Sequence, residues 1–154
     1  MNGLHVVFRV ADAEYVLAAE QVLHLEAFEA VTRVPGTPYY VAGVMQTRGQ
    51  LVPVVDLRRR FHMPEARPTL DSRVIVVQVA QRVIGLLVDR AREVVRLSES
   101  SFRTPPELVA ARANGFIKAV AEMGPEKRMA MLIDLLRVVG EVKSDDERDA
   151  EQAS

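Results

Sequence analysis

Residues 41–57, VAGVMQTRGQLVPVVDL, constrain the fold of this chain more than any other stretch. Two apolar runs, Val41–Met45 and Leu51–Val55, flank a short polar segment that contains an Arg-Gly pair. Apolar, β-branched runs on either side of a glycine-containing turn are typical of a β-hairpin. The second run leads into Asp56, a leucine and three arginines, which predicts a short helix capped by the aspartate.

Alternating or nearly continuous apolar runs predict strands along most of the remaining chain. The predicted strands cover residues 4–10, 14–18, 22–28, 72–80, 83–88, 91–97, 115–123 and 128–133. Residues 98–108, which contain two adjacent prolines, are expected to form a loop. Nine or ten short strands with regular turn signals and few helices indicate an all-β protein built of small barrels.

The domain organisation predicted from the sequence is one domain over residues 1–140, made of two lobes. A loop with prolines at positions 64 and 68 separates lobe one, about 4–62, from lobe two, about 72–133. A terminal helix is expected at about 134–140, followed by a disordered acidic tail at 141–154. VPVVDLRR at 53–60 and MLIDLLRV at 131–138 share one order: an apolar strand, an aspartate, a leucine and then a basic residue. Each segment is therefore expected to close one barrel with a capped helix.

Composition argues against several classes of partner. A formal net charge of −1 and 5% aromatic residues do not suit a nucleic-acid surface, which needs a basic, aromatic-rich face. No apolar run approaches the roughly 20 residues of a membrane helix. The first residues lack the charged-then-apolar layout of a signal peptide. These observations predict a soluble, cytoplasmic protein with no nucleic-acid partner and no membrane insertion.

The sequence also lacks the residue patterns of a reaction site. It has no cysteine, and its three histidines, His5, His24 and His62, do not have the spacing of metal ligands. It has no G-x-S-x-G elbow and no phosphate-binding loop. We therefore predict a protein that is not an enzyme, with no catalytic residue, metal or cofactor.

Two places in the sequence are candidates for contact with other proteins. If Leu23 and Leu25 face the core, Val22 and His24 lie on the outer surface of their strand. An exposed valine beside a histidine fits either an interface or an isolated surface residue. Arg48, on the predicted hairpin turn, fits either a solvated turn residue or an interface anchor.

The segments VVFRVADAEYVL, TRVPGTPYYVAGVMQTRGQLVPVVDLRRRF, VIVVQVAQRVIGLLVDRAREVVRL and MLIDLLRV occur in this order. With these segments, residues 4–139 resemble the CheW family of chemotaxis coupling proteins. The resemblance implies two five-stranded, SH3-like β-barrels packed side by side, with short helices.

The resemblance also implies a non-enzymatic adaptor. Its partners would be the cytoplasmic tips of methyl-accepting chemoreceptors and the regulatory domain of a CheA-type histidine kinase. By the same resemblance, Val22, His24 and Gly43 would contact the kinase, whereas Arg48 and Val94 would contact the receptor or support that contact. The alternative is a CheW-like protein that binds receptors without the kinase, as an array filler or insulator. His24, at a position that is commonly acidic in the family, keeps this alternative open.

Overall fold

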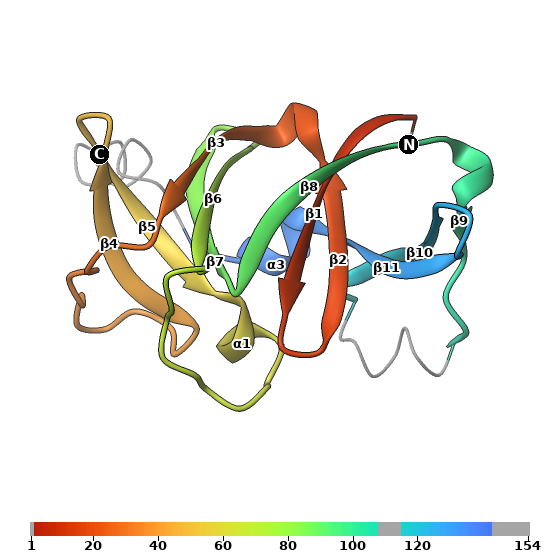
Figure 1. Ribbon diagram of the computed structural model, residues 1–154. Helices are drawn as coiled ribbons and strands as arrows, with labels where there is room; N and C mark the ends of the chain where they lie inside the picture. Colours follow the sequence, from red (N-terminus) through yellow and green to blue (C-terminus); the bar gives the residue numbers. More distant parts are fainter. Residues whose placement is uncertain (1, 108–114, 143–154) are drawn as a thin grey trace.

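The computed structural model describes residues 2–107 and 115–142 and shows two curled β-sheets lying side by side (Figure 1). One sheet has six strands in the order β8-β1-β2-β11-β10-β9, and the other has five in the order β3-β6-β7-β5-β4. The predicted all-β class with two small barrels is confirmed. One sheet has a sixth strand because β9, in the segment predicted to be a loop, pairs with β10.

The helices and strands lie close to the predicted segments. The six-stranded sheet contains β1 (Gly3–Val10), β2 (Ala13–Ala18), β8 (Arg90–Leu97), β9 (Phe102–Arg103), β10 (Ile117–Met123) and β11 (Arg128–Ile133). The five-stranded sheet contains β3 (Val22–Ala27), β4 (Val41–Thr47), β5 (Gln50–Asp56), β6 (Arg73–Val79) and β7 (Arg82–Val88). The short helices among the described residues are η1 (Ala19–Gln21), α1 (Leu57–Arg60), η2 (Glu99–Ser101) and α3 (Leu135–Val139).

The two sheets do not correspond to the two predicted lobes. Strands β1 and β2, from predicted lobe one, pair with β8 and β11, whereas β6 and β7, from predicted lobe two, join β3 and β5. The proposed division at the loop of residues 63–70 is therefore wrong. The chain passes from the six-stranded sheet to the five-stranded sheet at η1 and returns after β7. Each sheet therefore contains strands from both halves of the sequence.

The repeated strand-aspartate-helix pattern appears once in each sheet. Asp56 ends β5 and accepts hydrogen bonds from the backbone N–H groups of Arg58 and Arg59, which begins α1. Asp134 follows β11 and accepts from the N–H of Arg137 in α3. Each of these two strands also takes part in a parallel pairing, β5 with β7 and β11 with β2. The predicted capped helices are confirmed.

Within the described ranges, buried apolar side chains form three clusters. The central cluster lies between the sheets and includes Phe8 and Tyr15 from one sheet and Ile75 and Leu86 from the other. Each sheet also encloses a smaller cluster of its own on its concave side. The large central cluster explains why two curled sheets form one structural unit, because residues of both sheets share it.

Arg60 on α1 and Arg82 on β7 hold the residues from α3 onward against the five-stranded sheet. Arg60 donates to the carbonyl oxygens of Arg137 and Val138, and its guanidinium lies 3.9 Å from the centre of the Tyr40 ring. Arg82 donates to the carbonyl oxygens of Gly140 and Val142 at 2.6 and 3.0 Å.

The acidic tail was predicted to begin at residue 141, but Val142 is buried in the central cluster. Residues 143–154, which make up the rest of the predicted tail, lie outside the described residues.

Candidate partner-binding surfaces

Strand β3 presents to solvent the side chains that were expected to be buried. Leu23 and Leu25 are 47% and 43% exposed, whereas the side chain of His24 is 14% exposed. Val22 is half-buried and packs against the central cluster. The prediction that the leucines face inward and leave Val22 and His24 outside is therefore wrong. The side chains of β3 still alternate regularly, but Val22, His24 and Glu26 lie on the more buried face and the two leucines on the exposed one.

His24 and Glu26 on β3 form a polar cluster with the end of β4. Thr47 Oγ1 donates to Glu26 Oε1 at 2.6 Å and lies 3.4 Å from His24 Nε2. His24 Nε2 and Arg48 Nε lie 3.2 and 3.7 Å from the same Glu26 oxygen. We call His24, Glu26, Thr47 and Arg48 the seam cluster. Because β3 and β4 are the two outer strands of the five-stranded sheet, these contacts help to close it into a barrel.

Arg48 occupies the tip of the β4–β5 hairpin. Arg48 and Gly49 form a two-residue turn between the paired residues Thr47 and Gln50, and both have positive φ, 50° and 78°. This turn is shorter than the five-residue polar segment of the sequence suggests, but the hairpin is as predicted. The Arg48 side chain is 69% exposed, so its contact with Glu26 is weakened by solvent and leaves the guanidinium accessible.

Gly43 is covered by the chain that precedes β4. A Cβ atom at this position would lie 2.3 Å from the carbonyl oxygen of Thr32, and the φ angle of 149° is one that L side chains rarely adopt. Thr32 and Val44 exchange two backbone hydrogen bonds of 2.9 and 2.8 Å beside it. Gly43 therefore permits a close approach of two backbones and offers no side chain to a partner.

Val94, on the edge strand β8, is 57% exposed. It pairs with Val6 on β1, and the next pair on the same face of the sheet is Leu4 with Arg96. Leu4 is 47% exposed, and the exposed Arg96 has no hydrogen bond or ion pair with any residue in the described ranges. We call Leu4, Val94 and Arg96 the β8 surface.

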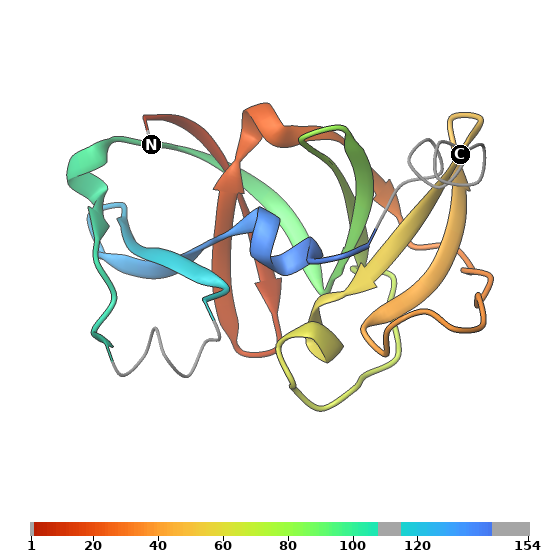
Figure 2. The same ribbon diagram turned by 180° about the vertical axis from the view of Figure 1, so that it is seen from behind.

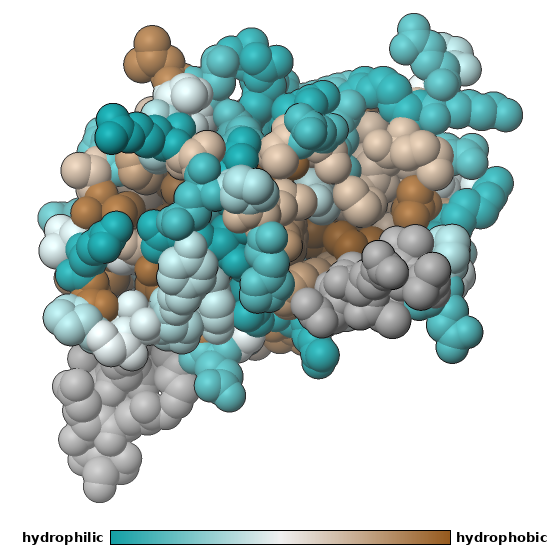
Figure 3. Space-filling view, turned by 90° about the horizontal axis from the view of Figure 1, so that it is seen from below, coloured by the Kyte–Doolittle hydropathy of each residue, from teal (hydrophilic) through white to brown (hydrophobic). Residues whose placement is uncertain are grey.

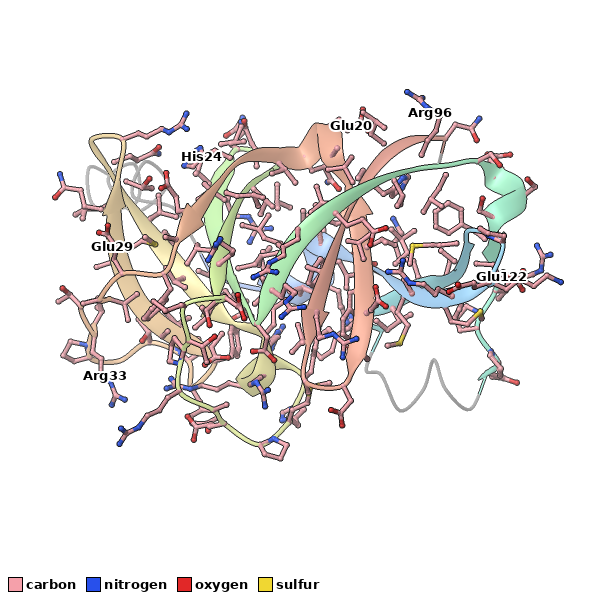
Figure 4. The ribbon with its side chains drawn as sticks, viewed as in Figure 1. Glu20, His24, Glu29, Arg33, Arg96 and Glu122 are labelled. Carbon is pink, nitrogen blue, oxygen red and sulfur yellow. The ribbon has the colours of Figure 1, made fainter. Side chains whose placement is uncertain are left out.

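The exposed leucines of β3 form a second apolar surface, on the other sheet. We call Leu23, Leu25 and the neighbouring seam cluster the β3 surface. In Figure 4, His24 and Arg96 mark the two surfaces on opposite sides of the view. Arg48, predicted to act with Val94, instead lies beside His24, so the structure does not bring the two predicted receptor residues together. On the lower side of the molecule, Figure 3 shows apolar side chains gathered across the centre and right of the view, with smaller apolar areas at the left, all bordered by hydrophilic side chains.

Sequence reasoning missed Leu4, Leu23 and Leu25 as surface residues. The alternation in both strands was correctly recognised, but apolar residues occur on both faces, so periodicity alone did not decide which face is buried. In β3, Glu26 could have shown which face of the strand is turned toward the barrel. Its carboxylate needs hydrogen-bond partners when partly buried, and Thr47 and Arg48 at the end of the next strand supply them.

The described residues contain no group of three or more histidine, cysteine, aspartate or glutamate side chains that could hold a metal. His5 is buried on β1, His24 belongs to the seam cluster and His62 is exposed after α1. None of the helices in the described ranges is long and apolar enough to cross a membrane. The accessible features are apolar and charged side chains on strands, which suit the binding of protein partners.

The fold and these surfaces define a two-barrel β-protein of the kind that binds other proteins through exposed strand faces. The family model described as a CheW-like domain matches residues 4–143, which is nearly the whole chain. The chain therefore belongs to the CheW family.

Individual relatives agree with this assignment. The chain is 33% identical over 139 residues to the chemotaxis protein CheW of Bacillus subtilis, covering 90% of this chain and 88% of that protein. It is 29% identical over 125 residues to protein FrzA of Myxococcus xanthus, covering 81% and 78%. Among solved structures, the scaffolding protein TtCheW of Thermoanaerobacter tengcongensis superposes with a TM-score of 0.80 at 30% identity, covering 92% of this chain and 94% of that chain.

Family membership establishes the general role. The protein is a scaffold of the chemotaxis signalling type, and members of this family are scaffolding proteins rather than enzymes. The two-barrel fold predicted from the resemblance is confirmed by the solved structure that it matches.

Proposed function

We propose that this protein couples methyl-accepting chemoreceptors to a CheA-type histidine kinase in chemotaxis or motility signalling. It would act from the cytoplasm, be recruited to membrane-associated receptor arrays, and contribute binding alone. The observation that carries the proposal is the presence of two separate exposed apolar surfaces on one rigid pair of sheets. Such an arrangement allows two partners to bind at once.

The β3 surface is the proposed kinase-binding side. Leu23 and Leu25 supply exposed apolar area, and the seam cluster beside them supplies polar groups that fix orientation. In this role Val22 and Gly43 act indirectly, since Val22 packs inward and Gly43 is covered by Thr32. A few apolar anchors in an interface of roughly 800 Å² per partner are sufficient for specific binding.

The β8 surface is the proposed receptor-binding side. Val94 and Leu4 provide adjoining exposed apolar side chains, and Arg96 provides an accessible positive charge next to them. A receptor segment with apolar anchors flanked by acidic residues would complement this surface. The receptor role predicted for Arg48 remains a prediction, and Arg48→Ala should be measured against both partners.

Matched variants separate the two proposed surfaces. Leu25→Asp is expected to weaken binding to the kinase regulatory domain at least about tenfold while leaving receptor binding within about twofold. Val94→Asp is expected to weaken receptor binding at least about tenfold while leaving binding to the kinase regulatory domain within about twofold. Titration calorimetry with each purified partner measures both effects. Met129→Asp is the control, because Met129 is 54% exposed on β11 and belongs to neither surface.

The results also distinguish the proposal from a receptor-only role. If the unaltered protein binds receptor fragments but shows no affinity for the kinase domain, the coupling function is wrong. If both aspartate variants behave like the Met129→Asp control, these two surfaces are not the contact sites.

A further inference from the structure

A pocket of about 270 Å³ lies at one mouth of the six-stranded barrel. It forms where β2 runs into η1 and β11 runs into α3, because these two strands are parallel and end on the same side. Figure 2 shows α3, in blue, below η1, in orange, and residues of both line the pocket. The side chains that matter here belong to His5, Glu20, Lys118, Leu132, Asp134 and Leu136, and we call this site the mouth pocket.

His5 gives the mouth pocket a buried polar atom without a partner. The residue is 3% exposed, and its Nδ1 lies 3.1 Å from the carbonyl oxygen of Gly3. Because a carbonyl oxygen can only accept, Nδ1 carries a hydrogen, and in the tautomer with that single hydrogen Nε2 is an acceptor. No residue in the described ranges donates to Nε2. Buried polar atoms are nearly always hydrogen-bonded, and His5 lines the pocket, so a ligand held there could supply the donor to this nitrogen.

The charged residues of the mouth pocket have both signs. Glu20, labelled in Figure 4, lies on η1, and Lys118 lies on β10. Both are exposed, and neither forms a hydrogen bond or ion pair with any other residue that the structure describes. Asp134 adds a second carboxylate, one oxygen of which accepts from the N–H of Arg137. Two carboxylates and one ammonium therefore face a space that also holds an imidazole acceptor.

The remaining wall of the pocket is apolar. Leu132 is buried, whereas Leu136 is 60% exposed beside it. An aliphatic group resting against these leucines would remove apolar area from water at both residues.

We propose that the mouth pocket binds a small zwitterion with an aliphatic body, such as a free aliphatic amino acid. Its ammonium group donates to His5 Nε2 and to the carboxylates of Glu20 and Asp134. Its carboxylate pairs with Lys118, and its side chain lies against Leu132 and Leu136. This site shares no residue with the β3 and β8 surfaces, so it would give the scaffold a ligand input in addition to its protein contacts.

The test uses L-leucine as the probe, with leucinamide and N-acetyl-leucine as analogues that lack one charge each. Titration calorimetry on the full chain is expected to show that L-leucine binds at least about tenfold more tightly than either analogue, since each loses one charge-assisted contact. In nitrogen-detected NMR, the His5 Nε2 resonance is expected to shift on addition of leucine, as it gains a donor.

Surface variants make the test specific. Glu20→Gln and Lys118→Gln are each expected to weaken leucine binding at least about fivefold without changing the unfolding midpoint, because neither side chain supports the fold. Glu29→Gln, an exposed carboxylate outside the pocket, is the control and should leave binding unchanged.

Absence of binding at about 10 mM leucine, or equal binding by all three compounds, would overturn the proposal. So would binding that the Glu20 and Lys118 substitutions do not affect. Because the readouts are ligand affinity and a histidine resonance, they are independent of whether the protein couples receptors to a kinase.

Discussion

Replacing Gly43 with alanine tests whether this predicted kinase-contact residue acts through the fold. The new Cβ would lie 2.3 Å from the Thr32 carbonyl oxygen and 2.8 Å from its carbonyl carbon, which are backbone atoms that cannot rotate away. The chain before β4 must move, and the two hydrogen bonds between Thr32 and Val44 are expected to break. Their loss costs about 1–3 kcal/mol in total.

Backbone strain adds to this cost. A non-glycine residue held at the φ of Gly43, 149°, costs about 1–3 kcal/mol. The free energy of unfolding should therefore fall by about 2–6 kcal/mol, a large share of the roughly 5–15 kcal/mol of a typical domain. Gly49→Ala is the matched control, because φ is also positive, 78°, but nothing lies within 4 Å of the added Cβ. It should cost only about 1–2 kcal/mol.

Urea denaturation followed by circular dichroism measures both variants. The expected result is a clearly lower midpoint for Gly43→Ala than for Gly49→Ala. If Gly43→Ala weakens kinase binding only by unfolding the protein, the folded fraction of the variant should still bind. Binding measured without denaturant at low temperature, where most molecules are folded, should then approach that of the unaltered protein. Equal stability of the two variants would refute the close-approach argument, and a binding loss without a stability loss would make Gly43 a direct contact.

Two further predictions follow from the orientation of β3 and from the hydrogen bonds of Arg82 to residues after α3. Val22→Asp should lower the free energy of unfolding by at least about 2 kcal/mol because Val22 packs against the central cluster, whereas Leu23→Asp should change it by less than about 1 kcal/mol. Thermal melts of both variants measure this, and equal melting temperatures would contradict the assigned orientation. Arg82→Ala should cost about 1.5–3 kcal/mol by removing the hydrogen bonds to Gly140 and Val142. An unchanged urea midpoint would show that these contacts do not hold the chain.

The positions of most strands were predictable because local alternation and turn chemistry determine them. The hairpin around Arg48 and Gly49 and the caps at Asp56 and Asp134 follow from residues close together in the sequence. The assignment of strands to sheets did not follow from the sequence pattern. The pairing of β1 with β8 joins residues about ninety positions apart, and neither strand's pattern identifies its partner.

The surfaces were predictable only in part. The sequence drew attention to β3, but His24 and Glu26 lie on its more buried face with Thr47, so the exposed side chains are those of Leu23 and Leu25. The prediction for Gly43 named a residue whose importance lies in backbone packing. The receptor role of Val94 stays a prediction; the structure shows that Val94 is exposed and, through the pairing of β1 with β8, that the exposed Leu4 lies near it.

The most direct test of the coupling function is whether both partners bind one molecule of this protein at the same time. Purified protein, the regulatory domain of a CheA-type kinase and a soluble receptor fragment can be mixed and their complex mass measured by light scattering after size-exclusion chromatography. The proposal predicts a ternary complex that Leu25→Asp reduces to a receptor-only complex and Val94→Asp to a kinase-only complex. Mutually exclusive binding, in which the receptor fragment displaces the kinase domain, would contradict it.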